Sequence, residues 1–351
     1  MNQLKKILDI WNWPIDTEWK IISGYFVYMI LGAVLLTIPL AQKMSTSFLD
    51  NIFVSVSAVS TTGLSTVSVY DNYNFLGQLI ILILIQIGGL GYMTLSSYLI
   101  ITAGKRLESS RNDIHGLSFS TIYPEQTKLF INKIIQFTFI FELIGAVFLY
   151  IFFKSENAVE PLWSAIFHSV SSFCTAGFSI YNDSMMKYSH HYGINLTIAV
   201  LSYAGGIGFI VWNDLWQRYR KRIYRISFTS EIILWATLVL TILGTLQFFI
   251  TEGNIHNNVF NELLIAFFQT MNAITTSGYN SVAMDKIQIS TILFLSFLMF
   301  VGASPAGTGG GLKSTTFIAN YALLKDKIRK YNRISFFGRE IPEEKIYVAV
   351  C

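Results

Sequence analysis

Cysteine, histidine and charged residues are scarce in this chain of 351 residues. Its two cysteines, Cys174 and Cys351, exclude a disulfide framework, and its five histidines are too scattered to form a metal site. Charged residues make up 13% of the chain and hydrophobic residues 52%, which leaves too little polar surface for a soluble protein of this length. The apolar runs contain no paired acids, no metal-binding spacing and no nucleophile–base set, so neither an enzyme nor a cofactor site is expected.

Long apolar runs dominate what the chain does contain. Six of them approach or exceed the length of a membrane-spanning helix: Ile21–Leu40, Phe75–Ile101, Ile131–Phe153, Ile194–Trp212, Ile232–Ile250 and Ile289–Ala303. A buried soluble core could account for one or two such runs but not for six, so the sequence predicts an all-α, multi-pass membrane protein. The first twenty residues hold Trp11, Trp13 and several charges but no cleavage site, which predicts an interfacial segment rather than a signal peptide.

Basic residues are distributed unevenly among the connections between these runs. Clusters precede the first run, separate the second from the third and the fourth from the fifth, and follow the sixth. The alternate connections carry only Lys43, Lys154, Lys187 and Lys286. Because cytoplasmic loops concentrate Lys and Arg, this asymmetry predicts that both ends of the chain are cytoplasmic and that the clusters contact anionic membrane lipid. Loops this short do not suggest nucleic-acid binding.

Three turns of similar sequence recur along the chain, each between a short amphipathic segment and an apolar run. They read Ser60-Thr61-Thr62-Gly63-Leu64-Ser65, Cys174-Thr175-Ala176-Gly177-Phe178-Ser179 and Thr275-Thr276-Ser277-Gly278-Tyr279-Asn280. When they are aligned on their glycines, a phenylalanine also coincides in all three copies, at Phe53, Phe167 and Phe268. Such a repeat is stronger than any single motif. Turns inside a membrane need protein or a watery cavity around them, so we expect the three to converge on one pore.

Each repeat predicts the order helix, half-helix, turn, helix. The half-helices are expected over Ser47–Val59, Leu162–Phe173 and Val259–Ile274, with Pro161 in the first turn of the second. They are too short to span a bilayer but suit re-entrant pore helices. The predicted division is 1–20 for a cytoplasmic N-terminal segment, 21–103 for the first unit, 104–130 for a cytoplasmic loop, 131–213 for the second unit, 214–230 for another cytoplasmic loop, 231–324 for the third unit with a gating loop at 302–313, and 325–351 for a cytoplasmic linker and the start of a truncated fourth unit.

A second repeated element lies inside the second apolar run of each unit. Gly88-Gly89-Leu90-Gly91 and Gly205-Gly206-Ile207-Gly208 are interpreted as sites of close helix packing. The third copy lies in Gly302-Ala303-Ser304-Pro305-Ala306-Gly307-Thr308-Gly309-Gly310-Gly311 and cannot form a regular helix, because it combines Pro with many Gly. We therefore predict that only the second helix of the third unit is broken within the membrane.

The chemistry of the turns favours a filter for a partly dehydrated monovalent cation. Backbone carbonyls can replace the hydration shell without burying a charge, and glycine allows the unusual dihedral angles that this requires. The predicted filter residues are Thr61, Thr62, Gly63, Leu64, Thr175, Ala176, Gly177, Phe178, Thr276, Ser277, Gly278 and Tyr279. The pore helices would direct their partially negative C-terminal ends toward the cation.

The broken segment of the third unit has two interpretations. The order Gly-Thr-Gly-Gly-Gly-Leu-Lys-Ser-Thr resembles a phosphate-binding loop, but Leu312 separates glycine from Lys313 and no strand precedes it. A gate below the filter is the preferred hypothesis, formed by Gly307, Thr308, Gly309, Gly310, Gly311 and Lys313. The alternative for Lys313 is that it extends toward the cytoplasm. Glu142 is left open between pairing with a neighbouring helix and lining the ion path.

By its three turns, its Gly-Gly-x-Gly elements and its broken segment 302–316, the chain resembles the Trk/Ktr/HKT superfamily of potassium transporters, most closely the Ktr-type membrane subunit. The resemblance implies a plasma (inner) membrane protein with helix–pore-helix–helix units around a central K⁺ pathway. It implies that the carbonyls of Thr62–Gly63, Ala176–Gly177 and Ser277–Gly278 hold the ion, and Gly63 is similar to K⁺-preferring members. Homodimerisation, a cytoplasmic nucleotide-binding regulatory ring and Na⁺ as a coupling ion are further implications.

One departure from the family separates the remaining hypotheses. The resemblance implies four units, yet the sequence ends soon after Gly338–Lys345, where a fourth unit would begin. Three turns cannot close a four-sided filter, so the leading expectation, K⁺ uptake, stands beside that of a non-conducting, truncated fragment. A secondary transporter of another small solute is the runner-up, although the repeated elements are rich in backbone and carry no matching ionisable residue.

Overall fold

The computed structural model describes residues 17–91, 94, 124–253, 258–305, 307–329, 335–336 and 339–340. The predicted N-terminal segment up to residue 16, most of the predicted loop over 104–130 and nearly all of the predicted linker after residue 329 lie outside these residues. Helices dominate the described part of the chain, as predicted, and its only strands are β1 (Ser335–Phe336) and β2 (Arg339–Glu340), which form one antiparallel pair.

The helices follow the repeated order that the sequence suggests. The first unit comprises α2 (Thr17–Thr37), η1 (Pro39–Ala41), α3 (Phe48–Val59), α4 (Val69–Asn72) and the helix Phe75–Gly91. The second comprises α6 (Pro124–Ser155), α7 (Pro161–Phe173), η2 (Met186–Tyr188), α8 (Tyr192–Ile207) and α9 (Phe209–Tyr219). The third comprises α10 (Phe228–Glu252), α11 (Val259–Thr275), η3 (Met284–Lys286), α12 (Ile289–Val301) and α13 (Ser314–Arg329).

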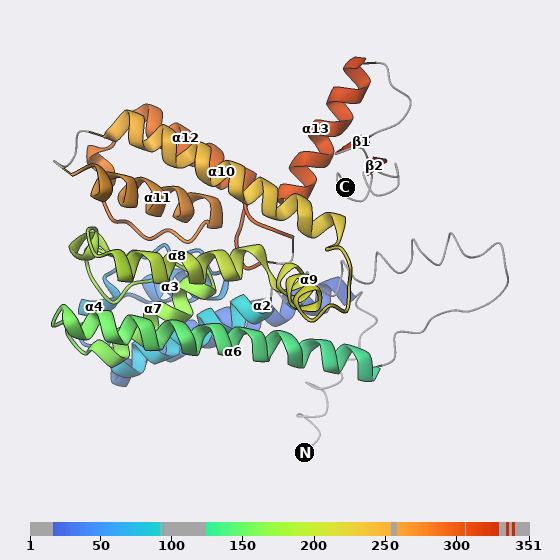
Figure 1. The fold of residues 1–351 in the computed structure, drawn as a ribbon. Helices are drawn as coiled ribbons and strands as arrows, with labels where there is room; N and C mark the ends of the chain where they lie inside the picture. The colour runs from blue at the N-terminus through green and yellow to red at the C-terminus, as the bar shows by residue number, and fades with distance from the viewer. Residues whose placement is uncertain are drawn as a thin grey trace.

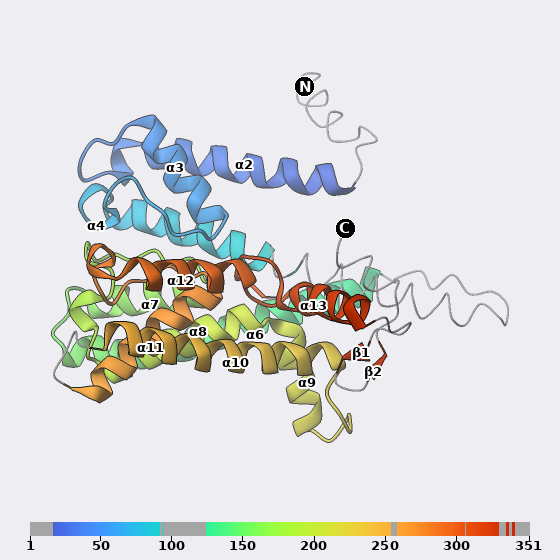
Figure 2. The same cartoon turned by 90° about the horizontal axis from the view of Figure 1, so that it is seen from above.

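The long helices lie roughly along one common direction (Figure 1). The short helix α4 marks one end of this bundle, whereas α9 and α13 lie at the other end in both views (Figure 2). The first unit forms one side of the bundle, and the second and third units pack against each other beside it (Figure 2). Consecutive units therefore remain neighbours in space.

Two described helical segments, Ile131–Ser155 and Phe228–Glu252, are long and apolar enough to cross a membrane unaided. Helices α8 and α9 reach that length only when counted together, and they meet at an angle of 96°. The remaining apolar helices are shorter: Ser23–Thr37, Phe48–Val59, Phe75–Gly91 and Ile289–Val301. The predicted run Phe75–Ile101 extends beyond the described residues.

Helices α3, α7 and α11, which the sequence predicts as pore helices, begin where local chemistry favours a helix start. The Ser47 hydroxyl caps α3 by accepting a hydrogen bond from the Asp50 amide, and Pro161 occupies the first turn of α7 as predicted. The Asn258 side chain caps α11 through the Phe260 amide. These caps satisfy backbone donors that a helix start otherwise leaves unpaired.

The second Gly-Gly-x-Gly element corrects one prediction. Gly205 packs closely, as expected, because an added Cβ would lie 1.8 Å from the Phe173 carbonyl oxygen. Gly208, however, ends α8 and starts α9 at φ 83°, in a region that favours glycine, and the chain bends there. The second helix of the second unit is therefore broken as well, not only that of the third.

Candidate functional site

The three predicted turns share one backbone geometry. The threonine two residues before the glycine of each turn, Thr61, Thr175 or Thr276, lies in the left-handed region at φ 51°, 51° or 55°. The glycines that follow have φ values of 79°, 68° and 87° in chain order. Between them, the amides of Thr62, Ala176 and Ser277 donate to the carbonyls of Ser57, Ser171 and Asn272 at 2.9, 2.8 and 3.0 Å. The sequence repeat is thus a repeat of conformation, down to individual hydrogen bonds.

The three turns approach one another so closely that side chains are excluded at two of the glycines. A Cβ added at Gly63 would lie 2.1 Å from the Ala176 carbonyl oxygen, and one at Gly177 would lie 1.7 Å from that of Ser277. At Gly278 the nearest atom is the Thr62 carbonyl oxygen, at 3.9 Å. The backbone carbonyls of neighbouring turns therefore meet around one point, with more space between the third turn and the first.

A polar cavity of about 490 Å³ lies directly beside these turns. Among the predicted filter residues, the three glycines and Phe178 line it. The rest of its wall comes from the segments that follow each turn, including Thr66, Ser179 and Asn280. We call this cavity the vestibule.

The residues that follow the glycines differ sharply in their surroundings. Phe178 is buried in a hydrophobic cluster that includes residues of the first unit, and Tyr279 is buried among residues of the second. The Tyr279 hydroxyl also donates to the Phe178 carbonyl at 3.3 Å. Leu64, by contrast, is 62% exposed. The second and third turns are thus anchored in the preceding unit, whereas the first turn has no such anchor among the described residues.

Polar side chains of the pore helices, which the sequence analysis did not identify, hold two of the turns. Six residues before the glycine, Ser171 donates through its hydroxyl to the Phe178 carbonyl at 2.8 Å, and the Asn272 side chain accepts from the Tyr279 amide at 3.2 Å. The equivalent hydroxyl of Ser57 finds no hydrogen-bond partner within the described part of the chain. The three residues each lie six positions before the glycine of their turn, and this constant spacing is the signal in the sequence that could have identified them.

The broken segment of the third unit lies against the turns of the second and third units. The Thr308 hydroxyl accepts from the Thr175 hydroxyl at 3.0 Å and lies 3.2 Å from the Phe173 carbonyl oxygen, to which it donates. The Gly310 amide donates to the Thr276 hydroxyl at 2.6 Å. The predicted gate residues and two predicted filter threonines are therefore in direct contact.

The break in α8 receives the same segment. The Thr308 amide donates to the Gly205 carbonyl at 3.0 Å, and the Ser304 amide donates to that of Gly206 at 3.1 Å. An added Cβ at Gly307 would lie 2.0 Å from the Gly206 carbonyl oxygen. Lys313 is half-buried and donates from its Nζ to the Gly309 carbonyl at 2.7 Å, so its ammonium turns back onto the segment.

A buried acid lies behind the second turn. Glu142 of α6 accepts from the Gln86 side chain at 3.2 Å, and the Cys174 sulfur lies 3.9 Å from both Glu142 and Gln86 oxygens. Gln86 belongs to the helix Phe75–Gly91, so Glu142 pairs with a neighbouring helix, one of the two possibilities left open. Among the described residues, no group of three or more His, Cys, Asp and Glu side chains could hold a metal ion.

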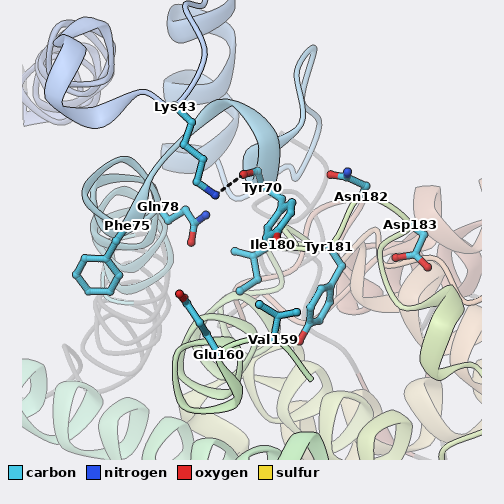
Figure 3. A pocket seen from close by; sticks show the side chains of 10 residues that line it. All are labelled: Lys43, Tyr70, Phe75, Gln78, Val159, Glu160, Ile180, Tyr181, Asn182 and Asp183. Atoms are coloured by element: carbon cyan, nitrogen blue, oxygen red, sulfur yellow. Dashed lines mark hydrogen bonds between the residues drawn. The ribbon is translucent and has the colours of Figure 1, made fainter. Parts of the chain in front are cut away.

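A second cavity, of about 320 Å³, lies between the first and second units, apart from the glycines (Figure 3). Lys43 lies on one side, where its Nζ donates to the Tyr70 carbonyl at 2.8 Å, and Glu160 and Asp183 lie on other sides (Figure 3). Asn182 connects this cavity to the vestibule, because it lines both. The charged side chains around it are of mixed sign.

The helical repeats and the converging turns define a membrane transport protein, and comparison with known proteins agrees. The family model described as TrkH, cation transport protein, matches residues 16–345. The chain is 32% identical to the Ktr system potassium uptake protein B of Vibrio alginolyticus over 92% of its own length and 72% of that protein. It is also 32% identical to the potassium/sodium uptake protein NtpJ of Enterococcus hirae, over 94% and 74%.

A solved structure shows the same fold. The potassium transporter TrkH of Vibrio parahaemolyticus superposes with a TM-score of 0.73 at 20% sequence identity, covering 95% of this chain and 68% of that one. The chain belongs to the TrkH family of cation transport proteins. The resemblance to the Trk/Ktr potassium transporters and the helical transporter fold, both predicted from the sequence, are confirmed.

Proposed function

We propose that this chain carries K⁺ across the plasma membrane along a path lined by the backbone carbonyls of its three turns. The observation that supports this most strongly is the shared geometry of the turns, which bring Gly63, Gly177 and Gly278 to one cavity. Carbonyl oxygens fixed in this way can replace the water around a monovalent cation. The names of the relatives as potassium uptake proteins agree with K⁺ as the substrate.

The filter consists of the residues predicted from the sequence, with the carbonyls of Thr62, Ala176 and Ser277 nearest the neighbouring turns. Glycine in the first turn favours K⁺ over Na⁺ in this proposal. Na⁺ acts as a coupling ion rather than the main substrate, a role carried over from the family resemblance; the name of the potassium/sodium uptake protein of Enterococcus hirae links Na⁺ to that relative.

The segment 302–313 acts as the gate. Its Thr308 and Gly310 contact Thr175 and Thr276, so in this conformation it blocks the inner side of two turns. Its links to the rest of the protein are a few hydrogen bonds from loop backbone and hydroxyls, which can be exchanged for water when the segment moves. Lys313 stabilises the closed conformation through the Gly309 carbonyl.

The filter needs a fourth turn beside the first and third. Leu64 is exposed where Phe178 and Tyr279 are buried, and the approach of Gly278 to the first turn is looser than the other two. The alternative that the three described turns alone do not conduct therefore has a specific observation in its favour. Transport of another small solute has none.

The orientation and partners of the chain complete the proposal. The N-terminus faces the cytoplasm, as does the basic stretch Arg218–Arg225 that follows the bend at Gly208. This basic face meets a cytoplasmic nucleotide-binding ring, and the membrane protein works as a homodimer. Both are carried over from the family resemblance.

Rubidium uptake into a bacterium that lacks its own K⁺ uptake systems tests the proposal. The chain is expressed alone and also joined to a fourth turn-bearing unit, and we expect uptake in at least the second form. Gly177→Ala should abolish uptake, because the new Cβ would meet the Ser277 carbonyl, whereas Gly24→Ala faces open space and should leave uptake unchanged. Absence of uptake in both forms, or normal uptake with Gly177→Ala, would overturn the proposal.

A further inference from the structure

A histidine lies fully buried directly behind the second turn. His168 belongs to α7, and its side chain has no exposed surface. Its ring stacks on Tyr181 with a centroid distance of 5.0 Å and has Phe153 and Tyr279 as further aromatic neighbours, at 5.6 and 6.3 Å. No ion pair of His168 is found among the described residues. An apolar, aromatic surrounding of this kind favours the neutral imidazole.

The hydrogen bonds of His168 define which ring nitrogen carries the proton. Nδ1 lies 2.7 Å from the Ser164 carbonyl oxygen, which can only accept, so Nδ1 must donate. In the neutral ring Nε2 then accepts, and its partner at 3.0 Å is the Ser179 hydroxyl. That hydroxyl in turn accepts from the Tyr181 amide at 3.0 Å. The chain of bonds runs in one direction, from the Tyr181 amide through Ser179 and the imidazole to the Ser164 carbonyl.

Ser179 connects this histidine to the proposed filter. It follows Gly177 by two residues and lines the vestibule. The segment from Gly177 to Tyr181 therefore has a fixed point at Ser179, set by a buried ring that cannot shift without disturbing its aromatic neighbours. The position of the Gly177 carbonyl depends on this point and on the Ser171 contact to Phe178.

The third unit has a different residue at the position equivalent to His168. Gln269 precedes Gly278 by nine residues, as His168 precedes Gly177, and its Nε2 donates to the Ser281 hydroxyl at 3.2 Å. Gln269 and Ser281 are both buried. The same pore-helix position therefore contacts a serine after the turn in two units. The imidazole of His168 accepts from Ser179, two residues after the glycine, and the amide of Gln269 donates to Ser281, three residues after it.

The first unit has no polar side chain at the position equivalent to His168. Its equivalent residue is Val54, which cannot form a hydrogen bond. The segment after the first turn is held instead at the surface, where the Thr66 hydroxyl donates to Asp50 at 2.7 Å. Hydrogen bonds from Ser47 and Thr66 lower the pKa of the exposed Asp50 carboxyl and keep it ionised as the acceptor. The buried connection is therefore a feature of the second and third turns.

We propose that His168 is a positioning residue for ion selectivity: its neutral imidazole holds Ser179, and Gln269 holds Ser281 in the same role. This inference rests on the proposed function, since it assigns the part of the second turn that fixes the filter carbonyl. Glutamine should replace histidine at position 168, because the third unit already uses it there. Valine, the residue of the first unit, should not.

The uptake of Rb⁺ and Na⁺ is measured for His168→Gln and His168→Val of the full chain in the same cells. The membrane content and the melting temperature of each variant are measured as well. We expect the Rb⁺/Na⁺ uptake ratio of His168→Val to fall about tenfold, the scale for one lost buried hydrogen bond whose partner stays unsatisfied. His168→Gln should stay within about twofold of the wild type. Equal losses in both variants, or no loss in His168→Val while the wild type takes up Rb⁺, would overturn the inference.

Nitrogen NMR of the purified, ¹⁵N-histidine-labelled protein tests the geometry without any transport. The His168 signals, identified by their loss in His168→Gln, should show a neutral ring protonated at Nδ1, and Ser179→Ala should move the Nε2 signal. A ring protonated at Nε2, or no change with Ser179→Ala, would refute the positioning role. Failure of Rb⁺ uptake by the wild type in both forms, alone and joined to a fourth turn-bearing unit, would count against the proposed function, and the NMR result would still decide the role of His168.

Discussion

The threonine two residues before the glycine of each turn adopts a conformation that residues with a side chain rarely adopt. A left-handed φ costs a non-glycine residue about 1–2 kcal/mol, yet Thr61, Thr175 and Thr276 all have it. The hydroxyl oxygens of Thr175 and Thr276 each lie 2.7 Å from the carbonyl oxygen of the preceding residue. The same hydroxyls contact the segment 302–313, so one residue type both supports the turn and connects it to the proposed gate.

Thr308 is the residue at which this connection can be tested. Thr308→Val keeps the size of the side chain but removes the hydroxyl that contacts Thr175 and donates to the Phe173 carbonyl. Each lost bond is worth about 0.5–1.5 kcal/mol, so the closed conformation should weaken and Rb⁺ uptake should rise several-fold. Initial rates of uptake, corrected for the amount of protein in the membrane, measure this.

Thr197→Val is the matched control for Thr308→Val. The Thr197 hydroxyl donates only along its own helix, to the Gly193 carbonyl at 2.7 Å. Its loss should leave uptake unchanged. If Thr308→Val lowers uptake or has no effect, the contact supports the filter or is incidental, and segment 302–313 does not act as the gate.

At the scale of elements, the sequence predicted the pore helices to within a residue or two because their start signals are local. Ser47 and Pro161 act within one turn of helix, so their effect can be read without knowledge of the fold. The bend at Gly208 could not be predicted in this way. Gly-Gly-x-Gly in an apolar run is compatible with close packing and with a break, and here Gly205 does the first and Gly208 the second.

The bend makes a prediction about stability. Gly208→Ala places a side chain at φ 83°, which should destabilise the protein by about 1–3 kcal/mol. Gly24→Ala lies within α2, has no atom within 4 Å of its added Cβ, and should be neutral or slightly stabilising. Thermal melting in detergent, followed by size-exclusion chromatography, compares the two variants. Equal melting temperatures would mean that the chain relaxes at Gly208 and that the bend is not imposed by glycine.

The polar contacts of the pore helices could not be predicted from the sequence either. Ser171 and Asn272 share a distance to the turn glycine but not a residue type, and only the fold reveals that both hold the residue after the glycine. In the sequence, His168 is one of five scattered histidines, and nothing there links it to its partner Ser179, which lies on the far side of the turn. Contacts made across a turn depend on how the chain returns, and a linear pattern does not encode this return.

At the scale of the whole molecule, the units interlock in one direction. Phe178 of the second unit is buried beside residues of the first, and Tyr279 of the third is buried beside residues of the second. Continued by one step, the same rule places Leu64 of the first unit against a neighbour that precedes it around the pore. Leu64 is exposed, so it marks the side of the bundle that we expect a fourth turn to cover, which we call the open side of the assembly.

This rule predicts an asymmetry between two substitutions of equivalent residues. Phe178→Ala removes a buried aromatic ring and should destabilise the chain by about 3–5 kcal/mol. Leu64→Ala changes a mostly exposed side chain and should shift the stability by no more than about 0.5 kcal/mol. Melting of the two variants in the same detergent measures the difference.

When a fourth turn-bearing unit is joined to the chain, Leu64→Ala should become destabilising, because Leu64 then acquires the buried surroundings that Phe178 already has. If Leu64→Ala destabilises the chain alone as much as Phe178→Ala does, Leu64 is already packed, and the assembly has no open side for a fourth turn to fill.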